Sequence, residues 1–175
     1  TVAYYHGLNY SLVSGFSVGA TNHYFPYQIA DFSSRGPSDC IVNDPLSSQS
    51  IKPEVSAPGV AIRSSVLNGE YDNYNGTSMA APHVSGAVLL LKEAFPYLSG
   101  EDILYALYYS AVDLGSPGED NVYGKGLIDV YGAYLYLVDA GNTPVPPLSG
   151  NKDISILDLI EFNTNNKFKI KMLGG

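Results

Sequence analysis

The residues best suited to chemistry lie in one stretch, NGTSMAAPHVSG, which covers residues 75–86. Ser78 stands there among small residues, where a helix is expected to begin. Backbone N–H groups at a helix N-terminus have no intrahelical partner and favour negative charge. A serine that attacks a carbonyl carbon generates an oxyanion, which needs such donors nearby. Ser78 is therefore a candidate nucleophile.

Two other interpretations of this serine can be weighed on the pattern. A Thr-Ser pair ahead of a helix is most often a plain N-cap, whose side chain only satisfies backbone donors. The pattern alone favours this capping role. The G-x-S-x-G elbow of lipase-like enzymes is excluded, because Ala80 takes the place of its second glycine.

The elements expected before Ser78 are short strands. β-branched and aromatic residues, punctuated by glycine and proline, predict strands at residues 13–20, 28–32, 55–57 and 60–66. Asn68-Gly69 is a strong hairpin signal and predicts a returning strand at residues 71–74. Ser78 should therefore follow directly on a hairpin.

After Ser78, the spacing of the apolar residues changes to that of helices. Apolar residues at helical spacing predict a buried helix from Met79 to Phe95, with Pro82 in its first turn. A capping box at residues 99–102 predicts a second helix to about Ala111. A third helix is expected at residues 128–139, after a loop at 115–118.

Short strands followed by periodic helices fit a layered α/β or α+β domain. We assign residues 1–139 to this domain. Proline and glycine in residues 140–151 predict an extended linker. Residues 152–175 are then a tail or the start of a further module.

Composition narrows the class of partner. The net charge is −8, and the basic residues form no cluster that could neutralise a row of phosphates, so nucleic acid and anionic membrane are poor partners. The 15 tyrosines are not interleaved with basic residues and indicate packing rather than base stacking.

Cys40 is the only cysteine, which excludes an internal disulfide. No apolar run reaches the length of a spanning helix, and no signal peptide is recognisable after Thr1.

Five ordered stretches resemble the subtilisin-like serine proteases. They are FSVGATN (16–22), DFSSRGP (31–37), KPEVSAPGV (52–60), GTSMAAPHVSG (76–86) and YGKGLIDV (123–130). The resemblance covers residues 1 to about 138. It implies a three-layer α/β sandwich with a mostly parallel sheet, incomplete here at its N-terminal side.

The resemblance also implies a role for Ser78. Ser78 would attack the scissile peptide carbonyl, form an acyl-enzyme and contribute its own N–H to the oxyanion hole. The triad Asp and His, and the oxyanion-hole asparagine, are expected upstream of Thr1. Residues 1–175 alone should then be inactive. A non-catalytic subtilisin-fold module, a pseudoprotease, is the alternative.

By the same resemblance, the substrate pocket would involve Thr1, Val2, Ala3, Gly76 and Thr77. The other polar candidates fit less well. His6 and His23 match no base motif of the family, His83 is expected to be a core histidine, and Asn73 and Asn75 do not match the oxyanion-hole asparagine.

The resemblance requires no cofactor for the chemistry and assigns no metal ligand, although it leaves room for a structural calcium ion. Asp113, Glu119 and Asp120 match no calcium loop in their spacing, so a solvated turn is favoured. The implied partners are polypeptide substrates and the missing N-terminal half of the domain. An extracellular or cell-surface location follows by resemblance alone, and Asn9-Tyr10-Ser11 would be a glycosylation sequon in a secretory setting.

Overall fold

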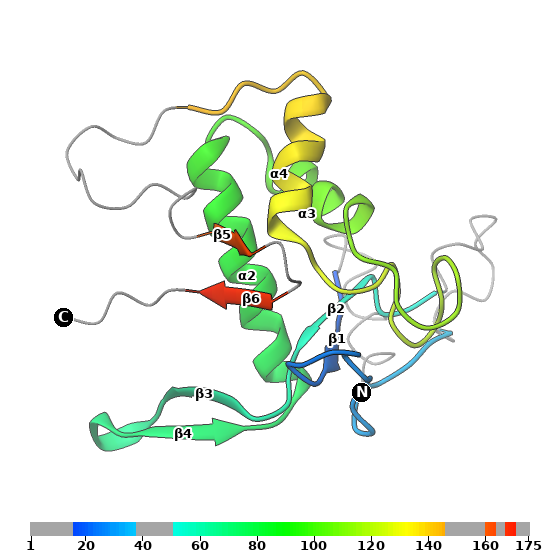
Figure 1. Ribbon diagram of the computed structural model, residues 1–175, viewed down its shortest axis with the longest axis vertical. Coiled ribbons are helices and arrows are strands. Elements are labelled where there is room, and N and C mark those ends of the chain that lie inside the picture. Colours follow the sequence, from blue (N-terminus) through cyan, green and yellow to red (C-terminus); the bar gives the residue numbers. More distant parts are fainter. Residues whose placement is uncertain (1–15, 38–50, 146–159, 164–166, 171–175) are drawn as a thin grey trace, which may run out of the picture.

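The computed structural model describes residues 16–37, 51–145, 160–163 and 167–170. The expectations for Thr1 to Ala3, His6, residues 9–11 and Cys40 lie outside these residues. A long helix, α2 (Thr77–Ala94), is the central element, and the first strand pair and the other helices pack against it (Figure 1).

The sheet at the start of α2 consists of two parallel strands. β1 (Val18–Thr21) pairs with β2 (Val55–Pro58), with Val18 opposite Val55 and Thr21 opposite Pro58. Ala20, Val55 and Ala57 are fully buried, because α2 covers this pair. The strand predicted at 55–57 is confirmed. The one predicted at 13–20 is observed as Val18–Thr21, with residues 13–15 outside the described part.

The strand predicted at residues 28–32 was wrong. Only Ile29 forms a bridge, to Thr21, and the chain turns at residues 31–32. The Ile29 N–H donates to the Tyr123 hydroxyl (3.1 Å) and the Ala30 N–H to the Ala20 carbonyl (2.8 Å). These separate anchors make the segment a fixed loop, which β propensity alone could not reveal.

The hairpin predicted from Asn68-Gly69 is confirmed. β3 (Ile62–Ser65) and β4 (Tyr71–Tyr74) are antiparallel and extend away from the helices (Figure 1). The turn between them, η2 (Leu67–Gly69), holds Asn68 at φ 65° and Gly69 at φ 75°. These left-handed values are the ones that Asn-Gly accepts most readily. β3 is shorter than the predicted 60–66, because Val60 and Ala61 leave the ladder.

The helix that carries Ser78 begins two residues before the predicted Met79. Its buried face consists of Ala80, Val84, Ala87, Leu91 and Ala94. Pro82 therefore lies in the second turn, so its assignment to the first turn was wrong. A proline there removes the N–H that would otherwise bond to the Ser78 carbonyl. The helix tolerates this loss near its exposed end.

Two further helices complete the core. α3 (Gly100–Tyr109) begins with the predicted capping box and ends two residues before Ala111. α4 (Val130–Asp139) begins two residues after the predicted Ile128, because the Ile128 N–H donates to the Ser56 carbonyl (3.0 Å) and Asp129 is the N-cap. The three helices enclose a cluster of large side chains: Leu91, Phe95, Ile103, Leu107 and Leu137.

The loop between α3 and α4 returns to the sheet. Leu127 forms bridges with both Ser56 and Val112. Gly126 (φ 116°) passes so close to Val112 that a Cβ would lie 1.9 Å from its carbonyl oxygen. Only glycine fits such an approach. The glycines of YGKGLIDV are thus explained by backbone packing.

After α4 the chain stays attached to the helices. The Val145 N–H donates to the Ala94 carbonyl (2.8 Å), and the Tyr97 hydroxyl donates to the Thr143 carbonyl (2.9 Å). Farther on, β5 (Ile160–Asn163) and β6 (Lys167–Ile170) form an antiparallel pair. The division into a domain at 1–139, a linker at 140–151 and a tail at 152–175 stays a prediction.

Candidate active site

The N-terminus of α2 carries no side-chain cap. Its N-cap residue is Gly76, whose carbonyl accepts from the N–H groups of Met79 (3.0 Å) and Ala80 (3.3 Å). Ser78 is the second helical residue and is exposed. Within the described ranges, neither its N–H nor its hydroxyl has a hydrogen-bond partner. The plain N-cap interpretation of Ser78 was therefore wrong, because Gly76 is the N-cap residue and no side chain caps this helix.

Two glycines join this helix end to the sheet. The Gly76 N–H donates to the Gly59 carbonyl (2.8 Å), and the Gly59 N–H donates to the Thr21 carbonyl (2.8 Å). A Cβ on Gly59 would lie 2.6 Å from the Ala20 Cβ and 2.7 Å from the Gly76 oxygen. Ser78 is thus held at the carboxyl ends of β1 and β2, the edge at which open α/β sheets bind ligands.

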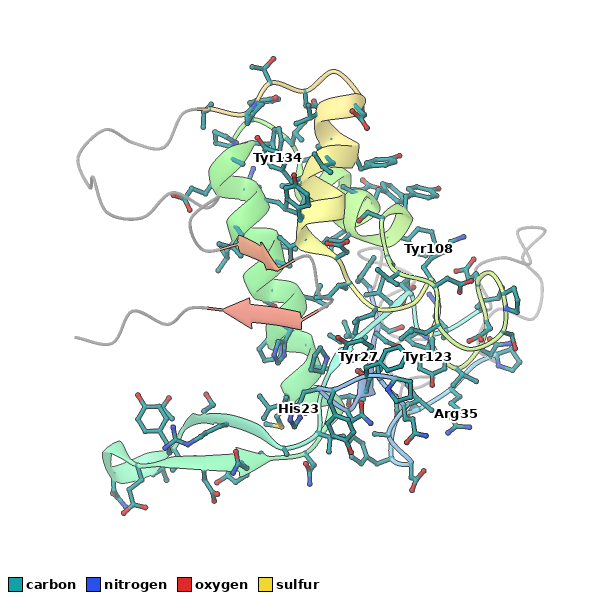
Figure 2. All side chains as sticks on the ribbon, viewed as in Figure 1. His23, Tyr27, Arg35, Tyr108, Tyr123 and Tyr134 are labelled. Atoms are coloured by element: carbon teal, nitrogen blue, oxygen red, sulfur yellow. The ribbon has the colours of Figure 1, made fainter. Side chains whose placement is uncertain are left out.

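The base of the hairpin is a bulge. Ile62 pairs with Tyr74, while the next connection joins Gly59 to Gly76, so one strand has an extra residue. The Ala61 N–H donates to Asn75 Oδ1 (2.6 Å), and the His23 ring Nδ1 lies 3.1 Å from the Val60 carbonyl oxygen. Figure 2 shows His23 at this place, between the hairpin base and the start of α2.

The two described histidines have contacts of their own. His23 is exposed and bonds to the bulge, whereas the half-buried His83 holds its ring Nδ1 2.9 Å from the Met79 carbonyl oxygen. In the part of the chain that the structure describes, no histidine or aspartate side chain is hydrogen-bonded to Ser78. The structure therefore brings Gly76, Thr77 and Ser78 together without a base.

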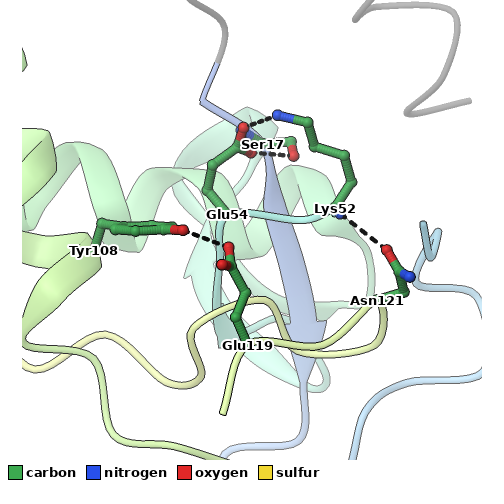
Figure 3. Close-up of polar contacts among 6 residues, drawn as sticks. All are labelled: Ser17, Lys52, Glu54, Tyr108, Glu119 and Asn121. Carbon is green, nitrogen blue, oxygen red and sulfur yellow. Dashed lines mark hydrogen bonds and ion pairs between the residues drawn. The ribbon is translucent and has the colours of Figure 1, made fainter. Parts of the chain in front are cut away.

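Two groups of polar contacts connect residues near β1, β2 and α3 (Figure 3). The partly buried Glu54 carboxylate accepts from the Ser17 N–H and hydroxyl and pairs with Lys52. Glu119 accepts from the Tyr108 hydroxyl and lies 3.7 Å from Lys125 Nζ. Burial, and then the bond to Glu119, raises the pKa of Tyr108 well above its ordinary value. The first group of contacts joins the starts of β1 and β2, and the second joins α3 to the loop that follows it.

The acidic residues considered for calcium are also engaged by protein donors. Asp113 accepts from the Gly118 N–H (2.8 Å), and Asp120 accepts from the N–H groups of Val122 and Tyr123 (both 2.8 Å). Among the described residues, no group of three His, Cys, Asp or Glu side chains could hold a metal ion. These carboxylates organise the turn between α3 and α4.

A shallow apolar groove runs along α2 beside β1. It is lined by Phe16, Val18, Ala81, Val84, Ser85, Val88, Leu89 and Leu104, and Leu89 is 71% exposed. At the end of β1, the Asn22 Oδ1 atom is buried without a partner in the described chain. A buried polar acceptor without a partner is uncommon in folded proteins.

Two contributors to the site were missed in the sequence. In the sequence, Gly59 only separates the strands predicted at 55–57 and 60–66, and Asn75 is only a residue that does not match the oxyanion-hole asparagine. Asn75 carries no local signal for this contact, because its partner Ala61 is 14 residues away along the chain. Gly59 carries none, since its neighbours Ala20 and Gly76 are distant in sequence.

An exposed serine on an uncapped helix, held at the carboxyl ends of parallel strands, places the protein among the α/β proteins with a ligand site at this edge. The subtilase family model (peptidase S8) matches residues 5–126. The chain belongs to the subtilase family of serine proteases. The subtilisin-like fold expected from the sequence is confirmed by solved structures.

The similarity is spread over most of the chain. Bacillopeptidase F of Bacillus subtilis is 43% identical over 129 residues, which are 71% of this chain and 8% of that protein. The minor extracellular protease Vpr of the same organism is 39% identical over 66% of this chain and 16% of its own length. The Clostridium perfringens CspB protease structure matches with a TM-score of 0.60 and 33% identity, over 73% of this chain and 27% of that chain.

The chain thus spans less than a third of the length of each of these proteins. No described helix combines the length and the apolar character that crossing a membrane would require.

Proposed function

We propose that this chain is part of a serine endopeptidase that hydrolyses peptide bonds through an acyl-enzyme on Ser78. The observation that carries the proposal is the exposed Ser78 at the uncapped start of α2, whose own N–H has no hydrogen-bond partner among the described residues. Membership of the subtilase family supports the same chemistry.

In the proposed reaction, the Ser78 oxygen attacks the scissile carbonyl carbon while a histidine takes the hydroxyl proton. The carbonyl oxygen becomes an oxyanion, which the Ser78 N–H stabilises with a second donor. The histidine then returns its proton to the leaving amine, and water hydrolyses the acyl-enzyme by the same steps. The histidine, its aspartate and the second donor come from residues upstream of this chain.

The proposal therefore requires a complementary part of the domain. The open groove beside α2 and the unsatisfied Asn22 oxygen support it, because both are expected where another part of the domain packs. The small share of each relative that this chain covers supports it as well. The complete protein consists of this chain together with those upstream residues. Relatives named as extracellular proteases favour an extracellular location.

The test is covalent labelling of the complete, folded protein with a serine-directed fluorophosphonate, followed by mapping of the modified residue. Ser78 should be labelled, and Ser78→Ala should abolish both labelling and peptide hydrolysis. Ser64→Ala is the matched control, because Ser64 is an exposed serine of β3, in the hairpin that precedes α2. Labelling that persists in Ser78→Ala would overturn the assignment.

A pseudoprotease is the second candidate. The observation in its favour is that no described side chain is placed to deprotonate Ser78. The same labelling separates the two, since a pseudoprotease would fold and bind peptides while Ser78 stayed unmodified.

A further inference from the structure

The bulge at the base of the β3–β4 hairpin lies directly ahead of the candidate nucleophile. It consists of Val60 and Ala61 on one side and Asn75 on the other, between the Ile62–Tyr74 pair and the Gly59–Gly76 bond. Bulges occur preferentially next to active sites, where they re-aim a strand. Here the strand whose direction changes is β4, and Ser78 follows the bulge residue Asn75 by three positions.

The bulge by itself is energetically unfavourable, so other contacts must stabilise it. Ala61 has φ 53°, a left-handed conformation that is unfavourable for a residue with a Cβ. The extra residue also leaves its backbone groups out of the ladder. The Asn75 side chain provides the missing acceptor for the Ala61 N–H at 2.6 Å. His23 provides a partner for the Val60 carbonyl.

We propose that Asn75 is a positioning residue for Ser78. Its side chain closes the bulge, and its backbone leads directly into Gly76, the N-cap of α2. When the bulge is closed, the Gly76 N–H donates to the Gly59 carbonyl. This hydrogen bond fixes the position of the first turn of α2 relative to β2. Asn75 therefore sets where the Ser78 hydroxyl and N–H stand relative to a bound carbonyl. This inference rests on the proposed function of Ser78.

The test compares variants of the complete protein in fluorophosphonate labelling rate, kcat, KM and melting temperature. Asn75→Ala removes the acceptor and should lower kcat and the labelling rate about tenfold with KM little changed, because small displacements of reacting groups are costly. Asn75→Asp keeps an oxygen acceptor and should retain most of the rate. Asn73→Ala is the matched control, an exposed asparagine two positions earlier whose side chain has no hydrogen bond in the described chain.

A second variant distinguishes an effect on the position of Ser78 from a general loss of stability. Ala61→Gly removes the left-handed strain, so Asn75→Ala/Ala61→Gly should recover most of the lost rate. The proposal is overturned if Asn75→Ala labels as fast as Asn73→Ala, or if its melting temperature falls while kcat does not. It is also overturned if the double variant folds but recovers nothing. Absence of labelling in the wild-type protein would instead overturn the proposed function itself.

Discussion

The starts of α2 and α3 solve the same physical problem in opposite ways. At α3, the Ser99 hydroxyl accepts from the Asp102 N–H (3.1 Å), and the Asp102 carboxylate accepts from the Ser99 N–H (3.0 Å). At α2 the N-cap is a glycine with no side-chain acceptor. At α3 a side chain thus accepts from one otherwise unpaired amide, that of Asp102, whereas no side chain caps an amide at the start of α2.

The two helix ends therefore differ in what their amides can bind. A capped end contributes stability, and α4 is also capped, by Asp129 on the Gly132 N–H (2.9 Å). An uncapped end forgoes that stability but keeps its donors for a negatively charged group. The absence of a cap beside Ser78 is therefore the feature to manipulate.

The largest effect is expected from giving α2 a cap. In the complete protein, Gly76→Ser introduces a hydroxyl at the N-cap, which can accept from the Ser78 N–H. We expect kcat to fall about 100-fold, the scale of losing one oxyanion-hole donor. Gly76→Ala adds the same Cβ without an acceptor, and it should lose less. The measurement is kcat on a peptide substrate.

Gly100→Ser serves as the position control, because a Cβ on Gly100 meets nothing within 4 Å. Equal losses in Gly76→Ser and Gly76→Ala would mean that backbone strain, and not capture of the amide, explains the effect.

A smaller effect is expected from removing the cap of α3. Ser99→Ala should lower the free energy of unfolding by about 1 kcal/mol and leave kcat unchanged. The hydrogen bond from the Ser99 hydroxyl, followed by that from its N–H, lowers the pKa of Asp102. That pKa should move back up in the variant, as NMR titration would show. Ser116→Ala, in an exposed loop, is the control for the unfolding measurement. A change in kcat with Ser99→Ala would contradict the view that the α3 cap contributes only stability.

The smallest effect concerns alkaline pH. Burial and the bond to Glu119 raise the pKa of Tyr108 in the folded state above its unfolded value near 10. The stability that the neutral Tyr108 contributes is therefore complete below about pH 10 and is lost as the pH rises above it. Unfolding curves between pH 9 and 11 should be less steeply pH-dependent in Tyr108→Phe. Tyr105→Phe, which removes an exposed tyrosine of the same helix, should leave the pH dependence unchanged.

Much of the fold could be predicted because its signals are local. The Asn68-Gly69 turn, the capping box at Ser99 and the helical period after Ser78 all depend on residues a few positions apart. The strand expected at 28–32 failed because its backbone donors go to Ala20 and Tyr123, far away in sequence. Local propensity is overruled wherever such tertiary bonds decide the path.

By itself, the sequence made Ser78 the candidate nucleophile, because GTSMAAPHVSG (76–86) is one continuous stretch whose resemblance to the family motif can be recognised along the chain. Only the tertiary structure decided how that residue is held. The contact of Gly59 with Ala20 and Gly76, and the closure of the bulge by Asn75, join segments brought together by folding. Steric fit and hydrogen-bond satisfaction between distant segments depend on three-dimensional distance, which spacing along a chain does not encode.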